Sequence, residues 1–299
     1  MQRAGSSPSE DAIAESMMPG RTDAVRQIFE AQGARPPLVS WSPRQALLHH
    51  PLLERFADQC RAVAADDARL WLDRLDLEAF AALRDWMMVV DVVEDGRDFI
   101  YAHYGRAIAE HYGHDMTGAA TSAFGGHISA FFTGLYRAAL VRQEWVLSEH
   151  EPPRSVFVRC WRRLIVPVFV PGPKVARFVA LNIAENELKA GLDMLPDPVF
   201  VLDRALQVMY ANGAAREIFR PRTSAPGVLS FEELTGQTLD PDASPIELLG
   251  GRQVRDRIEI NLGDKITEPV MVTINGVLYR DQALYAVSLR LLSPDLPAD

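Results

Sequence analysis

The stretch LPDPVFVLDRALQVMYANGAAREIF, residues 195–219, decides the fold. Two short apolar runs, at 199–203 and 206–211, stand on either side of a tight turn and predict a β-hairpin. Asn212 follows the second run directly and precedes a segment that is predicted to be helical. Because an Asn side chain accepts hydrogen bonds from the free N–H groups of a first helical turn, Asn212 is predicted to cap this helix, and its loss to cost about 1 kcal/mol.

Downstream of this stretch, three further strands are predicted, at 254–262, 269–279 and 283–291. The first of them alternates apolar residues with charged ones, which is typical of a strand with one buried face and one exposed face. Together with the hairpin, these segments predict a five-stranded domain with short helices between its second and third strands.

The same order of predicted elements occurs once before, between residues 86 and 183. There a hairpin, a short helix and a longer helix with apolar residues at three- and four-residue spacing precede three strands. The strands are predicted at 86–93, 99–104, 144–150, 155–170 and 175–183, and the helices at 106–112 and 128–139. A repeated order of elements predicts two domains of one fold class.

Length, charge and composition narrow the class of protein. A length of 299 residues favours two domains of ordinary size over a single large one. The net charge of −9 provides no overall positive field for nucleic acid or anionic lipid, so neither is expected as a partner. The N-terminus lacks the apolar run of a signal peptide, and no apolar run approaches the roughly 20 residues of a membrane span. A cytoplasmic location is therefore expected.

The boundaries of the two domains follow from shifts in composition. Residues 1–20 are rich in Ser, Gly, Pro and acidic residues and are predicted to be a disordered tail. The other predicted segments are an N-terminal helical segment over 21–70, a first domain over 71–184, a helical linker over 185–194, a second domain over 195–292 and a tail over 293–299.

The predicted linker carries an apolar stripe. Leu188, Leu192 and Leu195 recur at four- and three-residue spacing, so a helix here has one apolar face and a charged back. A helix of this length is marginal by itself in water, and we expect the stripe to pack on a sheet or on its twin in a homodimer. The alternative is a solvated linker, which Gly191 favours.

Residues 192–291 resemble a PAS domain, on the hairpin and helix of the opening stretch. Residues 71–184 are similar to a divergent PAS subgroup common in alphaproteobacteria, on FIYAHYG at 99–105, YGHDMTG at 112–118 and WRRLIVPV at 161–168. The resemblance implies an α+β fold with two PAS-like domains, each a five-stranded antiparallel sheet with helices on one face, preceded by N-terminal helices.

The resemblance implies a sensory signal-transduction protein that binds a small ligand or a signalling partner. Related chains usually continue into an output module, and neither a Gly-Gly-Asp/Glu-Glu-Phe string nor a helix-turn-helix is recognised here. A transcription regulator that acts through a partner or an undetected DNA-binding surface is the first alternative. An undetected enzyme is the second, although no motif of a nucleophile, zinc protease or phosphate loop occurs and no catalytic residue is predicted.

Haem and flavin are both disfavoured, and the cofactor stays unknown. The second domain has neither a histidine to ligate haem nor a cysteine to form a flavin adduct. In the first domain His127 is the best haem-ligand candidate, because it begins the long helix that lines the pocket in PAS relatives. Cys60 and Cys160 lack the spacing of a zinc site, so no metal is expected, and Cys160 is interpreted as a small core residue.

Arg162 interrupts the apolar face of the strand predicted at 155–170. An unpaired charge there costs several kcal/mol. Either a carboxylate or an anionic ligand therefore meets Arg162, or a β-bulge turns it outward into water. The predicted ligand-binding residues are Tyr101, His127, Phe131 and Arg162.

Overall fold

The computed structural model describes residues 9–64, 67–172, 174–219, 229–239, 241, 243–249, 253–261, 267–280 and 282–292. The chain divides into two compact units, Met1–Glu185 and Asn186–Asp299. Each unit has a hydrophobic core of its own. Among the described residues, no helix combines the length and the apolar composition that crossing a membrane needs.

The N-terminal unit is built on a seven-stranded sheet. Its strands are β1 (Leu38–Trp41), β2 (Leu70–Trp71), β3 (Met87–Val93), β4 (Asp98–Tyr104), β5 (Val146–His150), β6 (Cys160–Val170) and β7 (Lys174–Glu185). Six of them form the antiparallel order β1-β5-β6-β7-β3-β4, and β2 pairs in parallel with β6.

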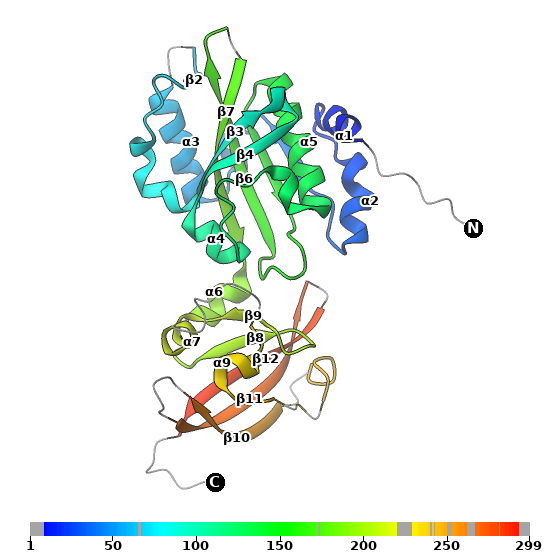
Figure 1. Ribbon diagram of the computed structural model, residues 1–299, viewed down its shortest axis with the longest axis vertical. Coiled ribbons are helices and arrows are strands. Elements are labelled where there is room, and N and C mark those ends of the chain that lie inside the picture. The colour runs from blue at the N-terminus through cyan, green and yellow to red at the C-terminus, as the bar shows by residue number, and fades with distance from the viewer. Residues whose placement is uncertain are drawn as a thin grey trace, which may run out of the picture. The chain divides into compact units, whose positions relative to one another are not determined.

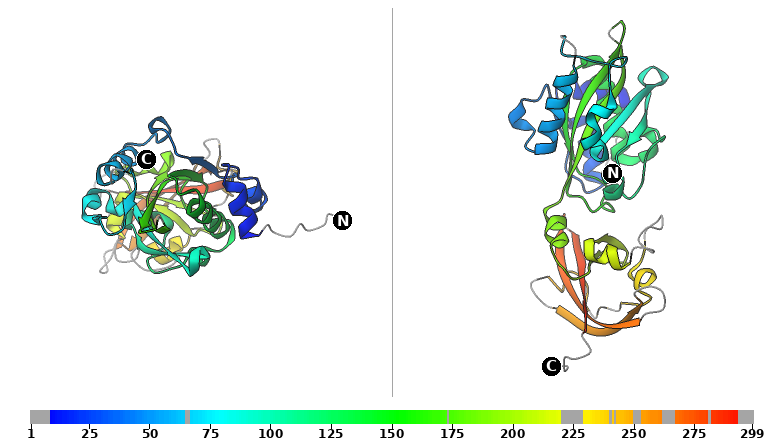
Figure 2. Two further views of the ribbon diagram at one scale, coloured as in Figure 1. Left: turned by 90° about the horizontal axis from the view of Figure 1, so that it is seen from above. Right: turned by 90° about the vertical axis from the view of Figure 1, so that its left-hand side faces the viewer.

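Helices cover both faces of this sheet, as Figures 1 and 2 show. One face packs against α1 (Glu10–Met17), α2 (Asp23–Ala31) and α5 (Gly126–Arg142). The other face packs against α3 (Pro51–Val63) and the 3-10 turns of η2 (Leu77–Trp86). Further helical pieces are η1 (Gln45–Leu47), η3 (Glu94–Gly96), α4 (Arg106–Tyr112) and η4 (Thr121–Phe124). The expected α+β class, with antiparallel sheets and N-terminal helices, is confirmed.

The first residues differ from the predicted disordered tail over 1–20. Residues 1–8 lie outside the described part of the chain, but α1 begins after Ser9, whose side chain caps the helix by accepting a hydrogen bond from Ala12 N at 3.3 Å. Ile13 is buried against Gly134 of α5. A Cβ atom on residue 134 would lie only 2.4 Å from Ile13 Cγ2, so only glycine allows this contact. Close packing on a glycine of another helix therefore orders this polar-looking segment.

The segment over 21–70 also differs from the purely helical prediction. It contributes β1, which adds to the sheet beside β5, and β2, which lies beside β6. Helix α3 buries Leu53, Phe56 and Cys60 against the sheet, so the segment belongs to the core of the N-terminal unit. These additions account for a sheet with more strands than the expected five and for helices on both of its faces.

The C-terminal unit is a five-stranded antiparallel sheet with short helices on one face (Figure 1). Its strands are β8 (Val199–Leu202), β9 (Val208–Ala211), β10 (Gln253–Asn261), β11 (Thr267–Tyr279) and β12 (Gln282–Leu291). Helices α7 (Gly213–Ile218) and α9 (Phe231–Thr235) bury Ala215, Phe231 and Leu234 in its core. The predicted hairpin and the helix after Asn212 are confirmed. The predicted tail over 293–299 lies outside the described residues.

The two sheets share one strand order. In the C-terminal unit the order is β10-β11-β12-β8-β9, so the last strand lies between the first hairpin strand and the penultimate strand. In the N-terminal unit the run β5-β6-β7-β3-β4 repeats that arrangement strand for strand. The repeated order of elements in the sequence thus corresponds to a repeated connection of strands.

The predicted linker contains helix α6 (Glu187–Asp193), which belongs to the C-terminal unit. Asn186 caps it by accepting a hydrogen bond from Lys189 N at 3.1 Å. Leu188 and Leu192 of the predicted stripe are half-buried, whereas Leu195 is 45% exposed. A role of this stripe in domain coupling or dimerisation stays a prediction.

We expect residues 186–299, expressed alone, to unfold in one cooperative thermal transition. The core of the C-terminal unit consists of residues from Phe200 to Leu289, so the fragment keeps every buried apolar contact of that core. Circular dichroism of the fragment measures the transition. A fragment that melts without a transition, or that aggregates on purification, would contradict the division at 185/186.

Candidate functional site

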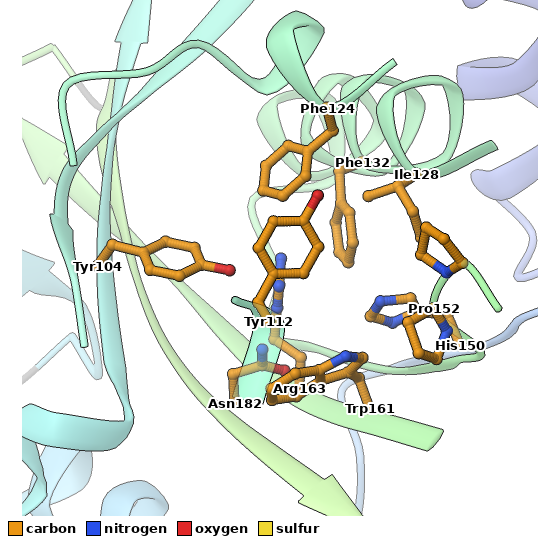
Figure 3. Close-up of a pocket in the computed structure, with 11 residues that line it drawn as sticks. Tyr104, Tyr112, Phe124, Ile128, Phe132, His150, Pro152, Trp161, Arg163 and Asn182 are labelled. Atoms are coloured by element: carbon orange, nitrogen blue, oxygen red, sulfur yellow. The ribbon is translucent and has the colours of Figure 1, made fainter. Parts of the chain in front are cut away.

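A small cavity lies between α5 and the sheet of the N-terminal unit (Figure 3). Its volume is about 20 Å³, enough for roughly one water molecule. Phe132 and Ile128 close it from α5, and Trp161, Arg163 and Asn182 close it from the strands. The lining consists of Tyr104, Tyr112, Phe124, Ile128, Phe132, His150, Pro152, Pro153, Trp161, Arg163 and Asn182.

Three buried polar residues form a row across the sheet beside this cavity. Ser148 on β5 is the register partner of Arg163 on β6, and Arg163 is the register partner of Asn182 on β7. Residues directly opposite each other point to the same face of a sheet, so the three side chains are neighbours. Ser148 Oγ, Arg163 Nε and Asn182 Oδ1 are all buried, and none of them has a hydrogen-bond partner in the part of the chain that the structure describes.

Arg163 is the unusual member of this row. It is only 3% exposed, and its Nη1 donates one hydrogen bond, to the hydroxyl of Tyr136 at 3.3 Å. Its guanidinium carbon lies 3.9 Å from the ring centroid of Phe132, a cation–π contact. Among the described residues no carboxylate forms an ion pair with it. A buried charge without a counter-charge costs several kcal/mol, so Arg163 lowers the free energy of unfolding of the N-terminal unit.

The tyrosines around Arg163 cannot neutralise its charge. Burial raises the pKa values of Tyr101, Tyr104 and Tyr136, so all three phenols keep their protons at neutral pH. Burial by itself lowers the pKa of Arg163, but the phenol oxygens of Tyr136, Tyr101 and Tyr104 outweigh this effect and the pKa is raised. The site is therefore a protonated guanidinium among neutral rings and polar groups.

Arg162, the predicted ligand residue, has a different environment from its neighbour. Its Nε donates to Glu149 Oε1 at 2.8 Å, and its Nη1 lies 3.0 Å from Glu185 Oε1. Of the three outcomes expected for Arg162, internal pairing with carboxylates is the observed one. Arg162 does not line the cavity.

The other three predicted ligand residues pack beside the cavity but do not line it. Tyr101 is fully buried close to Arg163 and Tyr136. His127 Nε2 lies 3.3 Å from Glu151 O, and the His127 ring makes an edge contact with Phe29 of α2. Phe131 contacts Phe29 and Phe132. The neighbours of His127 thus include a backbone carbonyl and an aromatic ring on α2.

Both cysteines, Cys60 and Cys160, are buried and form no disulfide. In the described part of the chain, no group of three or more His, Cys, Asp or Glu side chains is placed to hold a metal ion. Burial raises the pKa of the Cys160 thiol to about 11, so it is protonated at neutral pH. This environment agrees with the interpretation of Cys160 as a core residue.

The Asn212 side chain makes more hydrogen bonds than the cap of helix α7 requires. Its Oδ1 accepts hydrogen bonds from Ala215 N and Val199 N, both at 3.0 Å. Its Nδ2 donates to the carbonyls of Leu192, Leu195 and Asp197 at 3.1, 3.3 and 2.9 Å. The predicted cap is confirmed, and the same side chain also ties the segment after α6 to the hairpin.

Comparison with known proteins finds a similarity in the C-terminal part of the chain. Residues 187–259 match the family model of the PAS domain. No curated protein was found to match the chain.

Similar solved structures include three PAS domains. That of nitrogen regulation protein NR(II) from Vibrio parahaemolyticus is 22% identical over 36% of this chain and 100% of that chain, with a TM-score of 0.29. The PAS domain of an HTR-like protein from Haloarcula marismortui is 18% identical over 35% of this chain and 88% of that chain, with a TM-score of 0.29. That of BvgS from Bordetella pertussis is 14% identical over 36% and 84%, with a TM-score of 0.28.

The matched residues begin at α6, include the β8–β9 hairpin, α7 and α9, and end within β10. They lie entirely in the C-terminal unit. The similarity to the PAS domain family is therefore located in the C-terminal unit.

Proposed function

We propose that the chain is a sensory protein with two PAS-type domains in tandem. The N-terminal unit, on this proposal, is a divergent PAS-type domain of the subgroup common in alphaproteobacteria, enlarged by β1, β2 and the N-terminal helices. The shared strand order of the two sheets supports the tandem arrangement.

The N-terminal unit, we propose, detects a small molecule in the cavity between α5 and the sheet. The observation that carries this proposal is Arg163, a buried guanidinium that lines a cavity and lacks a carboxylate partner among the described residues. Charges that serve stability alone are normally paired when buried. A ligand that completes the hydrogen bonds of Arg163 would compensate the free energy that the burial of this guanidinium costs.

The C-terminal PAS domain and helix α6 are proposed to carry the response to a signalling partner or to a second copy in a homodimer. The partial exposure of Leu195 next to the half-buried Leu188 and Leu192 supports a contact there. The proposal treats the chain as a sensor without catalysis. A transcription regulator that works through a partner remains the alternative, and a gel-shift with purified protein tests it.

A thermal-shift screen of acidic, basic and neutral small molecules on the full chain tests whether the cavity binds a ligand. At least one compound should raise the melting temperature, because a ligand at 100 times its Kd stabilises the folded state by about 2.7 kcal/mol. Ile128→Phe fills the cavity of about 20 Å³ and should abolish that shift whatever the charge of the compound.

Val141→Phe is the matched control, because Val141 lies on the same helix and is 70% exposed. It should respond to the compound as the wild-type chain does. If no compound stabilises the wild-type chain, or if Ile128→Phe responds like Val141→Phe, the cavity is not the sensor site.

A further inference from the structure

We propose that the ligand of this cavity is a small monocarboxylate, bound through Arg163 and Asn182. This inference rests on the proposed function, because it names the chemical class that the proposed sensor site accepts. Three properties of the cavity determine the class: its charge, its hydrogen-bonding groups and its size.

The charge of the lining selects a monoanion. Arg163 supplies one positive charge, and the described lining residues include no Asp or Glu. A ligand with one negative charge balances the buried guanidinium, whereas a second negative charge would face Phe124, Phe132 and Trp161. Such a second charge would lose its water and could gain only the phenols of Tyr104 and Tyr112 or the imidazole of His150, with no second arginine or lysine among the described lining residues, which disfavours dicarboxylates and phosphate.

The polar atoms of the lining match the two oxygens of a carboxylate. Arg163 Nε donates no hydrogen bond to any described residue, and its planar fork suits bidentate contact with a carboxylate. Asn182 is 1% exposed and lies opposite Arg163 in the register of β6 and β7. Its Nδ2 carries two N–H groups that can donate to a carboxylate oxygen, whereas its Oδ1, which has no partner among the described residues, is an acceptor and has to turn away from the ligand. Tyr104 contributes a phenol that is protonated at neutral pH and able to donate as well.

The size of the cavity restricts the apolar part of the ligand. Its volume of about 20 Å³ holds roughly one water, so even a two-carbon acid must displace side chains at the half-buried edge formed by Tyr112 and Phe124. Each further carbon needs more displacement in a closely packed interior. The apolar rings and Ile128 then contact the short alkyl group. Acetate and propionate fit this description better than long-chain or aromatic acids.

Isothermal titration calorimetry on the full chain compares acetate and propionate with their neutral amides, acetamide and propionamide, and with succinate and phosphate at matched ionic strength. The acids should bind, the amides should bind at least about tenfold more weakly, and the two polyanions should not compete with propionate. Each amide has nearly the shape of its acid, so the comparison isolates the charge.

Three variants then connect the charge preference to Arg163. Arg163→Met should weaken propionate binding at least about thirtyfold, because it removes one partner of a buried charge pair. Arg163→Lys keeps the positive charge but loses the planar guanidinium, so its affinity for propionate should lie between those of the wild type and of Arg163→Met. Arg177→Met is the matched control, because Arg177 on β7 pairs with Asp91 at 2.6 Å and does not line the cavity.

The outcomes separate this inference from the proposed function. Equal binding of propionate and propionamide, tighter binding of succinate or phosphate, or propionate binding that survives Arg163→Met would each overturn the monocarboxylate. A neutral or cationic compound that stabilises the wild-type chain but not Ile128→Phe would also overturn the monocarboxylate. It would still support the cavity as the sensor site. If no compound in the screen raised the melting temperature, both the sensor cavity and the monocarboxylate ligand would be overturned.

Discussion

Asn212→Ala should lower the free energy of unfolding of the C-terminal unit by at least about 3 kcal/mol, well above the roughly 1 kcal/mol of a helix cap. Asn212 is fully buried and makes five hydrogen bonds, to two backbone N–H groups and three backbone carbonyls. Alanine leaves the buried N–H groups of Val199 and Ala215 without that partner, at about 1–3 kcal/mol each, whereas the three carbonyls are part-buried and Leu192 O still accepts a hydrogen bond from Leu195 N. Relaxation and entering water keep the total below the simple sum.

Ser230→Ala is the control for an ordinary cap. Ser230 accepts a hydrogen bond from Glu233 N at 3.1 Å in an exposed capping box of α9, so its loss should cost about 1 kcal/mol. Urea unfolding of residues 186–299, followed by circular dichroism, compares the two variants. Equal destabilisation by both would mean that Asn212 serves as a cap and nothing more.

Arg162→Met and Arg163→Met should have opposite consequences for the stability of the N-terminal unit, although the two residues are adjacent. Arg162→Met leaves Glu149 and Glu185 without their partner. These carboxylates are 28% and 24% exposed, so solvent screening reduces the cost from the 3–5 kcal/mol of a fully buried pair to about 2 kcal/mol.

Arg163→Met, in contrast, removes a charge that has no carboxylate partner among the described residues. The gain from not burying that charge is several kcal/mol, and it opposes the loss of a cation–π contact worth about 2 kcal/mol and of one hydrogen bond to Tyr136. The stability should therefore stay within about 1 kcal/mol of the wild type or rise.

Tryptophan fluorescence measures this pair of variants selectively, because all five tryptophans of the chain, the last of them Trp161, lie in the N-terminal unit. Urea unfolding of the full chain should show a lower midpoint for Arg162→Met and an unchanged or higher midpoint for Arg163→Met. If Arg163→Met were the more damaging of the two, Arg163 would be a structural residue rather than a residue kept for a ligand.

The elements that depend on local sequence could be predicted. Alternating apolar residues around a tight turn specify the hairpin β8–β9, and Asn212 marks the start of α7. Helix α1 could not be predicted in this way, because its polar sequence becomes ordered only through contacts with α5 at Gly134. Tertiary contact overrides local composition there.

The predicted ligand residue Arg162 lies on the same strand as Arg163, the arginine that lines the cavity. Both faces of β6 are apolar, since Leu164 and Val166 join one core cluster and Trp161 and Ile165 join the other. A period-two pattern therefore cannot tell which of two consecutive arginines faces the cavity. One unused signal was available: Asn182 is the single polar residue of the apolar run 178–183. Only the register of β5, β6 and β7 places Arg163 between Ser148 and Asn182.

A crystal structure of the full chain grown with propionate tests the central claim most directly. The account predicts a carboxylate between α5 and the sheet, with an oxygen about 2.7–2.9 Å from Arg163 Nε, the second oxygen within reach of Asn182, and the alkyl group against Phe132 and Ile128. An Arg163 guanidinium paired with a carboxylate of the protein itself, in a cavity that propionate does not enter, would contradict it.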